Sequence, residues 1–459
     1  MKFTDKSVSE IKIAYVGGGS RGWAWKLMSD LASAEDISGS VDLYDIDYEA
    51  AFHNELIGNR FNSAEGAKSK WIYKARKTLG EALNGADFVI ISILPGTFDE
   101  MESDVHTPEK YGIYQSVGDT TGPGGIIRAL RTIPMMEVIA KAIKEHSPNA
   151  WVINYTNPMA LCVKALYDTF PSIKAFGCCH EVFAVQELIG EAVKTYTGID
   201  ITERKGIKAN VIGLNHFTWI TDAKYKNIDA YELYARMAEE NKDCGLDMKN
   251  PESVFEYRHR VKFDLFLRYG IIAAAGDRHL AEFCNGSWYL DNPKQVEAWG
   301  FKLTPVSWRK KDLGDRLEKS KRLREGEEDV KIETSGEDGV RQIRALLGLE
   351  DYVTNVNLPN VGQIPNIPIG VIVETNAAFR DNSIVPVMAG NVPEGVLGLV
   401  ANAADAQLTV ARAARERDLE LAFRAFCQDP LVRLDTATAR ALFDEMVENT
   451  KEYLQEYFK

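Results

Sequence analysis

The sequence predicts an α/β protein in two parts: a doubly wound parallel sheet of the Rossmann type, followed by an α+β domain. Two observations support this prediction. The chain opens with a strand, a glycine-rich turn and a helix, and short apolar runs then alternate with helical stretches up to about residue 200. Such alternation is typical of parallel sheets whose crossover connections are helices. We therefore place residues 1–200 in the first domain and residues 201–459 in the second.

The opening segment contains a pattern that binds dinucleotides. Residues 11–16 (IKIAYV) are expected to form a buried strand, and the turn after them fits G-x-G-x-x-G. Glycine permits the tight turn and lets the backbone approach a pyrophosphate, while the following helix supplies amide donors from its N-terminus. The candidate cofactor-binding residues of this turn are Gly17, Gly18, Gly19, Ser20, Arg21 and Gly22.

Two further cofactor-binding positions follow the next predicted strands. The segment SVDLYDID is expected to form a strand ending at Asp45, which lies 23 residues after Gly22. A carboxylate there accepts hydrogen bonds from the adenosine ribose and favours NAD over NADP. Residues 86–93 (ADFVIISI) are apolar enough for a fully buried parallel strand, and Pro95 follows in the loop where ligands bind such sheets. This architecture is that of lactate and malate dehydrogenases.

The composition excludes several classes of partner. The chain has 54 Lys and Arg against 67 Asp and Glu, a formal net charge of −13. This acidic balance opposes binding to nucleic acid or to an anionic membrane. The start of the sequence shows no secretory leader, and no apolar run is long enough to span a bilayer. The six cysteines include no CxxC pair, so we expect reduced thiols in a cytoplasmic protein.

Four polar stretches are candidates for chemistry: residues 116–128, 177–182, 213–219 and 265–282. Thiolate and imidazole suit borderline metals, and substrate hydroxyls can complete the shell of a harder one such as manganese. However, Cys179 and His216 are 37 residues apart, too far for a finger-like structural site. On residues alone, an open catalytic metal site and ordinary core or salt-bridged loop residues both remain possible.

Taken together, these motifs resemble glycoside hydrolase family 4. The likeness rests on the GGGS turn, GDTTGPGGIIRALR, the NPM after WVINYT, the Cys-His pair and GLNHF, and it extends over essentially the whole chain. The family is the NAD- and manganese-dependent exception to the two-carboxylate rule for glycosidases. Phosphosugar members carry Asp or Asn directly after the metal cysteine, whereas this chain has CHEV. With GDRHLAEF, this pattern is most similar to the bacterial α-galacturonidases of the family.

The resemblance implies hydrolysis of α-galacturonides by transient oxidation. NAD⁺ would remove a hydride from C3 of the sugar, and the resulting ketone would acidify the proton on C2. A divalent metal, Mn²⁺ or another, would stabilise the enolate as a Lewis acid on O2 and O3. A base would take the C2 proton, the glycosidic oxygen would leave by elimination, water would add back, and the retained NADH would reduce C3 again.

The resemblance also implies roles for individual residues. Cys179 and His216 match the metal ligands, with Cys178 as a core neighbour. Tyr269 matches the base at C2, and Asp119 falls where the family has an acidic residue beside that tyrosine. A phenol must have its pKa lowered to act as a base, and a nearby metal does that.

The remaining roles concern the substrate. Asn157 matches a substrate-binding asparagine. His180 stands where phosphosugar members have their general acid, although Glu181 or a water also fits that role. A uronate carboxylate is best bound by a bidentate arginine. The candidates for binding it are Arg128, Arg278 and His279.

Three alternatives stay open from the sequence. The same mechanism suits an α-glucosidase, α-galactosidase or α-glucuronidase of the family. The first 200 residues also suit a malate- or lactate-type dehydrogenase, or a sensor that binds NAD without catalysis. Residues 394–459 are rich in Ala, Leu, Glu and Arg with long helical runs, so we expect a homo-oligomer, a dimer or a tetramer.

Overall fold

The computed structural model describes residues 1–459, and its main sheet has ten strands in the order β14-β13-β12-β7-β6-β5-β2-β3-β4, with β1 paired to β2. Neighbours from β4 to β7 in this order are all parallel. Parallel strands extend the sheet on both sides of β2, which is the doubly wound arrangement. This confirms the predicted fold class. The parallel strands are β2 (Val8–Val16), β3 (Ile37–Tyr44), β4 (Trp71–Ala75), β5 (Phe88–Ile91), β6 (Trp151–Asn154) and β7 (Lys174–Gly177).

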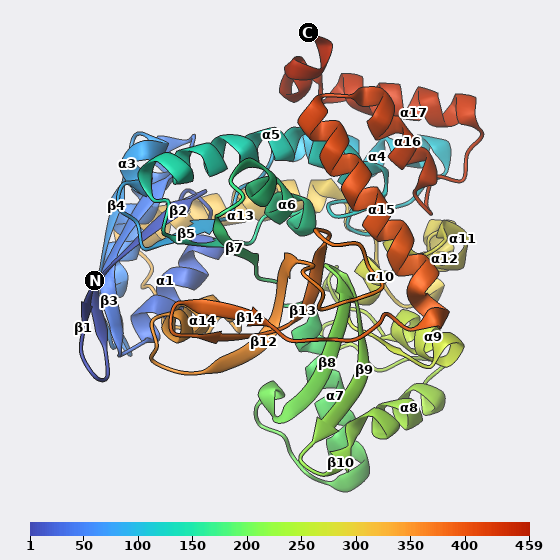
Figure 1. The fold of residues 1–459 in the computed structure, drawn as a ribbon, viewed down its shortest axis with the longest axis horizontal. Helices are drawn as coiled ribbons and strands as arrows, with labels where there is room; N and C mark the ends of the chain where they lie inside the picture. Colours follow the sequence, from blue (N-terminus) through green and yellow to red (C-terminus); the bar gives the residue numbers. More distant parts are fainter.

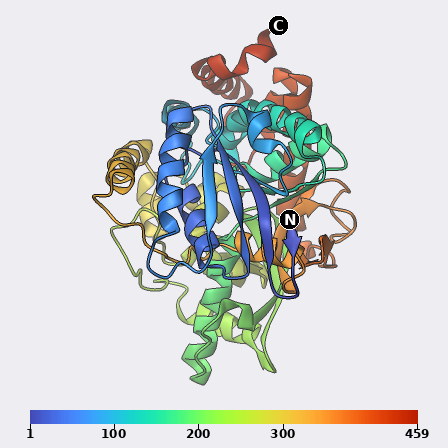
Figure 2. The same ribbon diagram turned by 90° about the vertical axis from the view of Figure 1, so that its left-hand side faces the viewer.

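Helices cover both faces of this sheet (Figures 1 and 2). Because side chains alternate along a strand, Ile13 and Tyr15 of β2 pack on one side and Ala14 and Val16 on the other, and all four are buried. Burial on both faces explains why the strands are nearly continuous apolar runs. The first face packs against α1 (Trp23–Ser33) and α2 (Tyr48–Phe61), and the second against α5 (Gly122–His146) and α6 (Met159–Thr169).

A second, antiparallel sheet forms the lower part of the molecule in Figure 1. In it β9 (Phe217–Tyr225) pairs with β8 (Ile207–Leu214), β10 (Ile228–Asp229) and β11 (Ile272–Ala273). A separate apolar core joins this sheet to α7 (Glu181–Thr197), α8 (Ala230–Glu240) and α9 (Arg260–Tyr269). The tight β8–β9 connection holds His216 in the left-handed region, with φ 62°.

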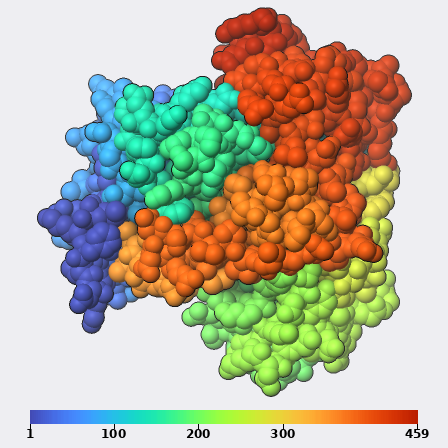
Figure 3. Space-filling model, viewed as in Figure 1, coloured from blue at the N-terminus to red at the C-terminus, as the bar shows by residue number.

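The last part of the chain returns to the main sheet. Strands β12 (Tyr352–Pro359), β13 (Ile372–Arg380) and β14 (Ser383–Pro386) extend it in antiparallel fashion, and β12 pairs with β7. The long α15 (Glu394–Glu416) then packs against α5, so the C-terminal residues cover much of the face in Figure 3. The main sheet thus contains strands from both sides of residue 200; the domain division at that residue stays a prediction.

Further helices and one short strand complete the chain, and none of the helices combines the length and apolarity needed to cross a bilayer. The one that matters most for the site is α13 (Val306–Glu325). The remaining elements are β1 (Lys2–Phe3), α3 (Leu79–Leu83), α4 (Phe98–His106), η1 (Pro108–Tyr111), η2 (Arg204–Gly206), α10 (Asp277–Phe283), α11 (Gly286–Tyr289), α12 (Pro293–Ala298), α14 (Gly339–Leu346), α16 (Leu419–Gln428), α17 (Thr436–Asn449) and η3 (Lys451–Phe458).

Candidate active site

The glycine turn after β2 has the shape that a dinucleotide requires. Gly17 has φ 94°, and a side chain there would overlap the carbonyl oxygen of Ser92. Helix α1 then begins after Gly22 with no side-chain cap and no acidic residue in its first turn. Its free amide groups and the positive end of its dipole are therefore open to an anionic ligand such as a pyrophosphate. These residues fit a dinucleotide.

Asp45 and Pro95 lie at the same edge of the sheet. The Asp45 carboxylate accepts hydrogen bonds from the amides of Gly19 (2.9 Å) and Asp47 (3.0 Å), so it is fixed beside the glycine turn. The Pro95 carbonyl accepts a hydrogen bond from Arg131 Nε (2.9 Å), which holds the loop after β5. Asp45 is thus held next to the turn, and Pro95 lies in the loop after β5, the strand beside β2.

Three side chains from separate elements meet beyond this edge. Ligand atoms of Asp119, His216 and His279 all lie within 4.8 Å of one another, and the two imidazole centroids are 3.9 Å apart. Asp119 comes from the loop before α5, His216 from the β8–β9 turn and His279 from α10. One carboxylate and two imidazoles at this spacing can hold a divalent cation. We call these three residues the acid–histidine cluster.

Thr120 orients the cluster. Its hydroxyl donates to Asp119 Oδ1 (2.8 Å) and lies 2.9 Å from His216 Nδ1. Because the hydroxyl proton points to the carboxylate, Nδ1 must be the donor in the second bond. That tautomer leaves Nε2 of His216 unprotonated, which is the form that binds a metal. Burial and the neighbouring His279 lower the pKa of His216 to about 3, so the ring is neutral, as this tautomer requires.

Cys179 is not one of the three members of the cluster, but its thiol lies near Asn215, the residue before His216. Its side chain is buried against Met159, Val163 and Ile372. Its backbone carbonyl accepts a hydrogen bond from Asn355 (3.2 Å). Burial, with Glu374 and Glu181 nearby, raises the pKa of the Cys179 thiol well above its usual value.

A buried amide–carboxylate network links Cys179 to His216. Asn355, which bonds the Cys179 carbonyl, also donates to Glu374 Oε1 (2.6 Å), while Asn215 donates to Glu374 Oε2 (3.2 Å). Asn215 immediately precedes His216, so Glu374 holds the segments of both predicted metal ligands. Cys178, by contrast, packs in the core below the sheet, as expected.

Two titratable residues, His180 and Glu181, follow Cys179 in the sequence, and their surroundings shift their pKa values in opposite directions. Glu181 accepts from the Gly276 amide (2.7 Å) and lies 3.6 Å from His279 Nε2. Burial would raise its pKa, but the neighbouring imidazoles of His279, His216 and His180 and the hydrogen bond from the Gly276 amide outweigh burial and lower the pKa of Glu181 to about 2. Glu181 therefore stays ionised and is a poor proton donor.

His180 is the better acid of the two. Its Nδ1 lies 3.1 Å from Glu337 Oε1, and its ring lies 6.1 Å from that of Trp23, the first residue of α1. Burial alone would lower the pKa of His180, but the hydrogen bond and negative charge of Glu337 outweigh burial and raise that pKa. Glu337 thus favours the protonated form of this imidazole.

Hydrogen bonds connect two of the predicted substrate-binding residues to Asp119. Asn157 donates to Asp119 Oδ2 (3.4 Å), and Arg128 Nε donates to the Asn157 carbonyl (3.1 Å). Burial opposes ionisation of Asp119, but Arg128, His279 and His216 keep its pKa below the usual range. Arg278 is already bonded to the carbonyls of Ser116 (2.8 Å) and Lys302 (3.3 Å) and to the Thr304 hydroxyl.

Tyr269 lies apart from the cluster, at the end of α9. Its ring packs edge-on to Trp219, with centroids 6.3 Å apart, and it also contacts Gly395. A different tyrosine, Tyr257, borders the site. A Cβ at Gly276 would lie 3.0 Å from Glu181 Oε2 and 3.2 Å from a ring carbon of Tyr257, so that ring is a neighbour of the Glu181 carboxylate.

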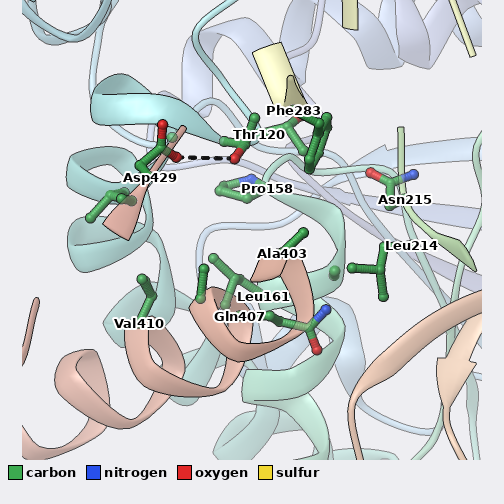
Figure 4. A pocket seen from close by; sticks show the side chains of 15 residues that line it. Thr120, Pro158, Leu161, Leu214, Asn215, Phe283, Ala403, Gln407, Val410 and Asp429 are labelled. Carbon is green, nitrogen blue, oxygen red and sulfur yellow. Dashed lines mark hydrogen bonds between the residues drawn. The ribbon is translucent and has the colours of Figure 1, made fainter. Parts of the chain in front are cut away.

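A small cavity of about 60 Å³ lies behind the cluster (Figure 4). Thr120 and Asn215 line it, and so do Ala403 and Gln407 of α15. Its volume suits a few water molecules but not a sugar. Thr121, also in its wall, donates to Asp429 (3.5 Å).

The fold and the site together define an enzyme class: a dinucleotide-dependent enzyme whose reacting groups lie at the carboxyl edge of a Rossmann-type sheet, beside a site for a divalent cation. Residues 12–195 match the sequence model of the family 4 glycosyl hydrolases, and residues 211–432 match the C-terminal domain of the same family. The chain belongs to glycosyl hydrolase family 4, which confirms the resemblance seen in the sequence.

Individual relatives agree with this membership. An α-galacturonidase of Thermoanaerobacterium saccharolyticum is 60% identical over 99% of this chain and 98% of its own length. The crystal structure of a Bacillus subtilis protein described as a glucosidase superposes with a TM-score of 0.92 at 51% identity, over 96% of this chain and all of the other. A Thermotoga maritima 6-phospho-β-glucosidase, solved with manganese, NAD⁺ and glucose-6-phosphate, shares the fold at 22% identity, with a TM-score of 0.76 over 96% of this chain and 99% of its own.

Proposed function

We propose that this protein hydrolyses α-galacturonides, with NAD and a divalent cation such as Mn²⁺ as bound cofactors. The observation that carries the proposal is the 60% identity to an α-galacturonidase over 99% of the chain. The surroundings of Asp119 support it, because the charges of Arg128 and Arg309 act on its carboxylate and a guanidinium suits an anionic sugar. A malate- or lactate-type dehydrogenase is disfavoured, because the chain belongs to a family of glycoside hydrolases.

The residues present fit both cofactors. The turn from Gly17 to Gly22, the free N-terminus of α1 and Asp45 would hold NAD. The acid–histidine cluster would hold the cation, with Cys179 as a further ligand once its thiol loses its proton. When bound, these groups supply reversible hydride removal at the sugar and Lewis-acid stabilisation of the negative charge that follows.

The side chains of the protein then position the substrate and move protons. Asn157 and Arg128, connected to each other and to Asp119, would bind sugar hydroxyls. His180, whose protonated form Glu337 favours, would donate a proton to the departing glycosidic oxygen.

The base at C2 has two candidates. The family resemblance favours Tyr269, whereas the contacts of the chain place Tyr257 next to Glu181. A proton at C2 can be removed only by a group within hydrogen-bond reach of it. The two tyrosines lie in different surroundings, so variants of each distinguish them.

A panel of p-nitrophenyl glycosides tests the proposed function. The purified protein is assayed with NAD⁺, Mn²⁺ and a thiol reductant on the α-galacturonide, α-galactoside, α-glucoside and α-glucuronide. We expect preferential cleavage of the galacturonide, dependence on both cofactors and no net formation of NADH. Net NADH production without release of nitrophenol would indicate a dehydrogenase instead, and NAD binding without either reaction would indicate a sensor.

Three further features of the chain belong to this proposal. We propose a cofactor part up to residue 200 and a substrate part after it, supported by the separate family matches on 12–195 and 211–432. We also propose a homo-oligomer, a dimer or a tetramer, in the cytoplasm. The cytoplasmic location is supported by the six unpaired cysteines, two of which, Cys244 and Cys427, are exposed.

A further inference from the structure

Helix α13 contacts the cofactor turn through one of its arginines. Arg316 Nη1 donates to the Arg21 carbonyl (3.0 Å), and a side chain at Gly22 would overlap that same guanidinium. One face of the helix therefore lies against the glycine turn. Residues seven apart, two turns of an α-helix, point to the same side. The residue seven before Arg316 is Arg309, about 10 Å away along the helix axis.

The segment around Arg309 is fixed beside the acid–histidine cluster. Thr304 donates its amide to the Ser116 carbonyl (3.3 Å) and bonds to Arg278 through its hydroxyl. Trp308 packs edge-on to Phe255, with centroids 5.2 Å apart, and the Arg278 guanidinium lies 5.3 Å from the centre of that same ring. The start of α13 thus packs on the residues that carry Asp119 and His279.

Arg309 differs from the basic residues near it because it has no partner. Lys310 pairs with Asp99 (2.7 Å) and also with Glu102, and Arg316 pairs with Asp312 (2.6 Å). Arg309 is half-buried, yet no hydrogen bond, ion pair or aromatic ring satisfies its guanidinium. A partly buried charge without a partner costs free energy, which a bound anion would recover.

The other arginines near the cluster are less suitable for an anionic ligand. The guanidinium of Arg278 is bonded to two carbonyls and a hydroxyl. Arg128 is buried next to Asp119, whose charge it balances, although its Nη1 has no partner. Of the three arginines near the cluster, Arg309 is the one whose guanidinium is both unpaired and accessible.

We propose that Arg309 binds the carboxylate of the uronate substrate and thereby selects it over neutral hexoses. The inference rests on the proposed function. A guanidinium matches a carboxylate with two parallel N–H···O bonds. A hexose with a hydroxymethyl group in that position would leave the guanidinium unpaired, so the neutral sugar is discriminated against.

The test compares Arg309→Met with Arg309→Lys and with a matched control, Lys311→Met. Lys311 lies on the same helix, exposed and without an ion pair. For the wild type and each variant, kcat and KM are measured on the α-galacturonide and on the α-galactoside. Binding of free galacturonic acid and of galactose is measured by calorimetry. Because Arg309 has no partner within the protein, we expect the variants to unfold at a temperature no lower than that of the wild type.

We expect Arg309→Met to lower kcat/KM on the galacturonide by about 10- to 100-fold, mainly through KM. Galacturonic acid should lose affinity by a similar factor, while the galactoside and Lys311→Met stay unchanged. Arg309→Lys should lie in between. Wild-type kinetics and wild-type galacturonic acid affinity in Arg309→Met would overturn the role of Arg309 alone. A wild type that cleaves no galacturonide would overturn the proposed function itself.

Discussion

Replacing Thr120 by valine tests the acid–histidine cluster most directly. The substitution keeps the shape of the side chain and removes one hydroxyl, which accepts from His216 Nδ1 (2.9 Å) and donates to Asp119 Oδ1 (2.8 Å). The bond to the neutral ring is worth about 1 kcal/mol and the bond to the carboxylate about 2 kcal/mol. Because Thr120 is only half-buried, water can replace part of that total. We expect metal affinity to fall by about 10- to 100-fold.

The assay is titration of the apoprotein with Mn²⁺, followed by calorimetry and by recovery of activity. The matched control is Thr121→Val, which removes a neighbouring hydroxyl whose partner is Asp429 at 3.5 Å and not a cluster residue. The control should bind Mn²⁺ as the wild type does. If Thr120→Val binds Mn²⁺ with unchanged affinity, the hydroxyl does not orient His216 for a metal and the reasoning fails.

Three other predictions follow from the same geometry. Tyr257→Phe and Tyr269→Phe identify the base, because the variant that lacks it should exchange the C2 proton with deuterated water at least about 100-fold more slowly while still binding NAD. Unaltered exchange in both variants would exclude a tyrosine base. Burial raises the pKa of Glu374 to about 7, above its ordinary value of 4.5, so the stability it contributes is complete below about pH 4.5 and is lost as the pH rises through about 7. Glu374→Gln should therefore melt at a higher temperature than the wild type at pH 8 but not at pH 4.5, and an equal difference at both pH values would contradict this. Oxidants should abolish activity, and the Cys179→Ala variant should be inactive. The Cys178→Ala variant changes only the core and should stay active. An active Cys179→Ala variant would refute the assignment of Cys179 as a metal ligand.

The sequence was sufficient to predict the cofactor part of the molecule. A glycine turn between a buried strand and a helix is a local pattern, and Gly17 and Asp45 could be located because each directly follows its strand. That these strands are parallel follows from the same alternation, since helical crossovers connect parallel strands.

The residues that complete the site could not be found in this way. Tyr257 lies in a loop with no periodicity or motif, and only the folded chain brings its ring against Gly276. Arg309 belongs to a densely charged helix, where nothing local separates an unpaired arginine from paired ones such as Arg316. Such residues are defined by contacts between segments far apart in the sequence, and a single sequence does not encode those contacts locally.

The pairing of β12 with β7 has a consequence for how the protein is made. Strand β7 ends at residue 177 and its partner begins at residue 352, so during synthesis the edge of the main sheet stays open while the intervening chain emerges from the ribosome. An open edge presents unpaired amides and carbonyls on which another nascent chain can add a strand. A fragment that stops near residue 200 would keep that edge permanently, so we expect it to aggregate, even though it contains the complete dinucleotide-binding motif.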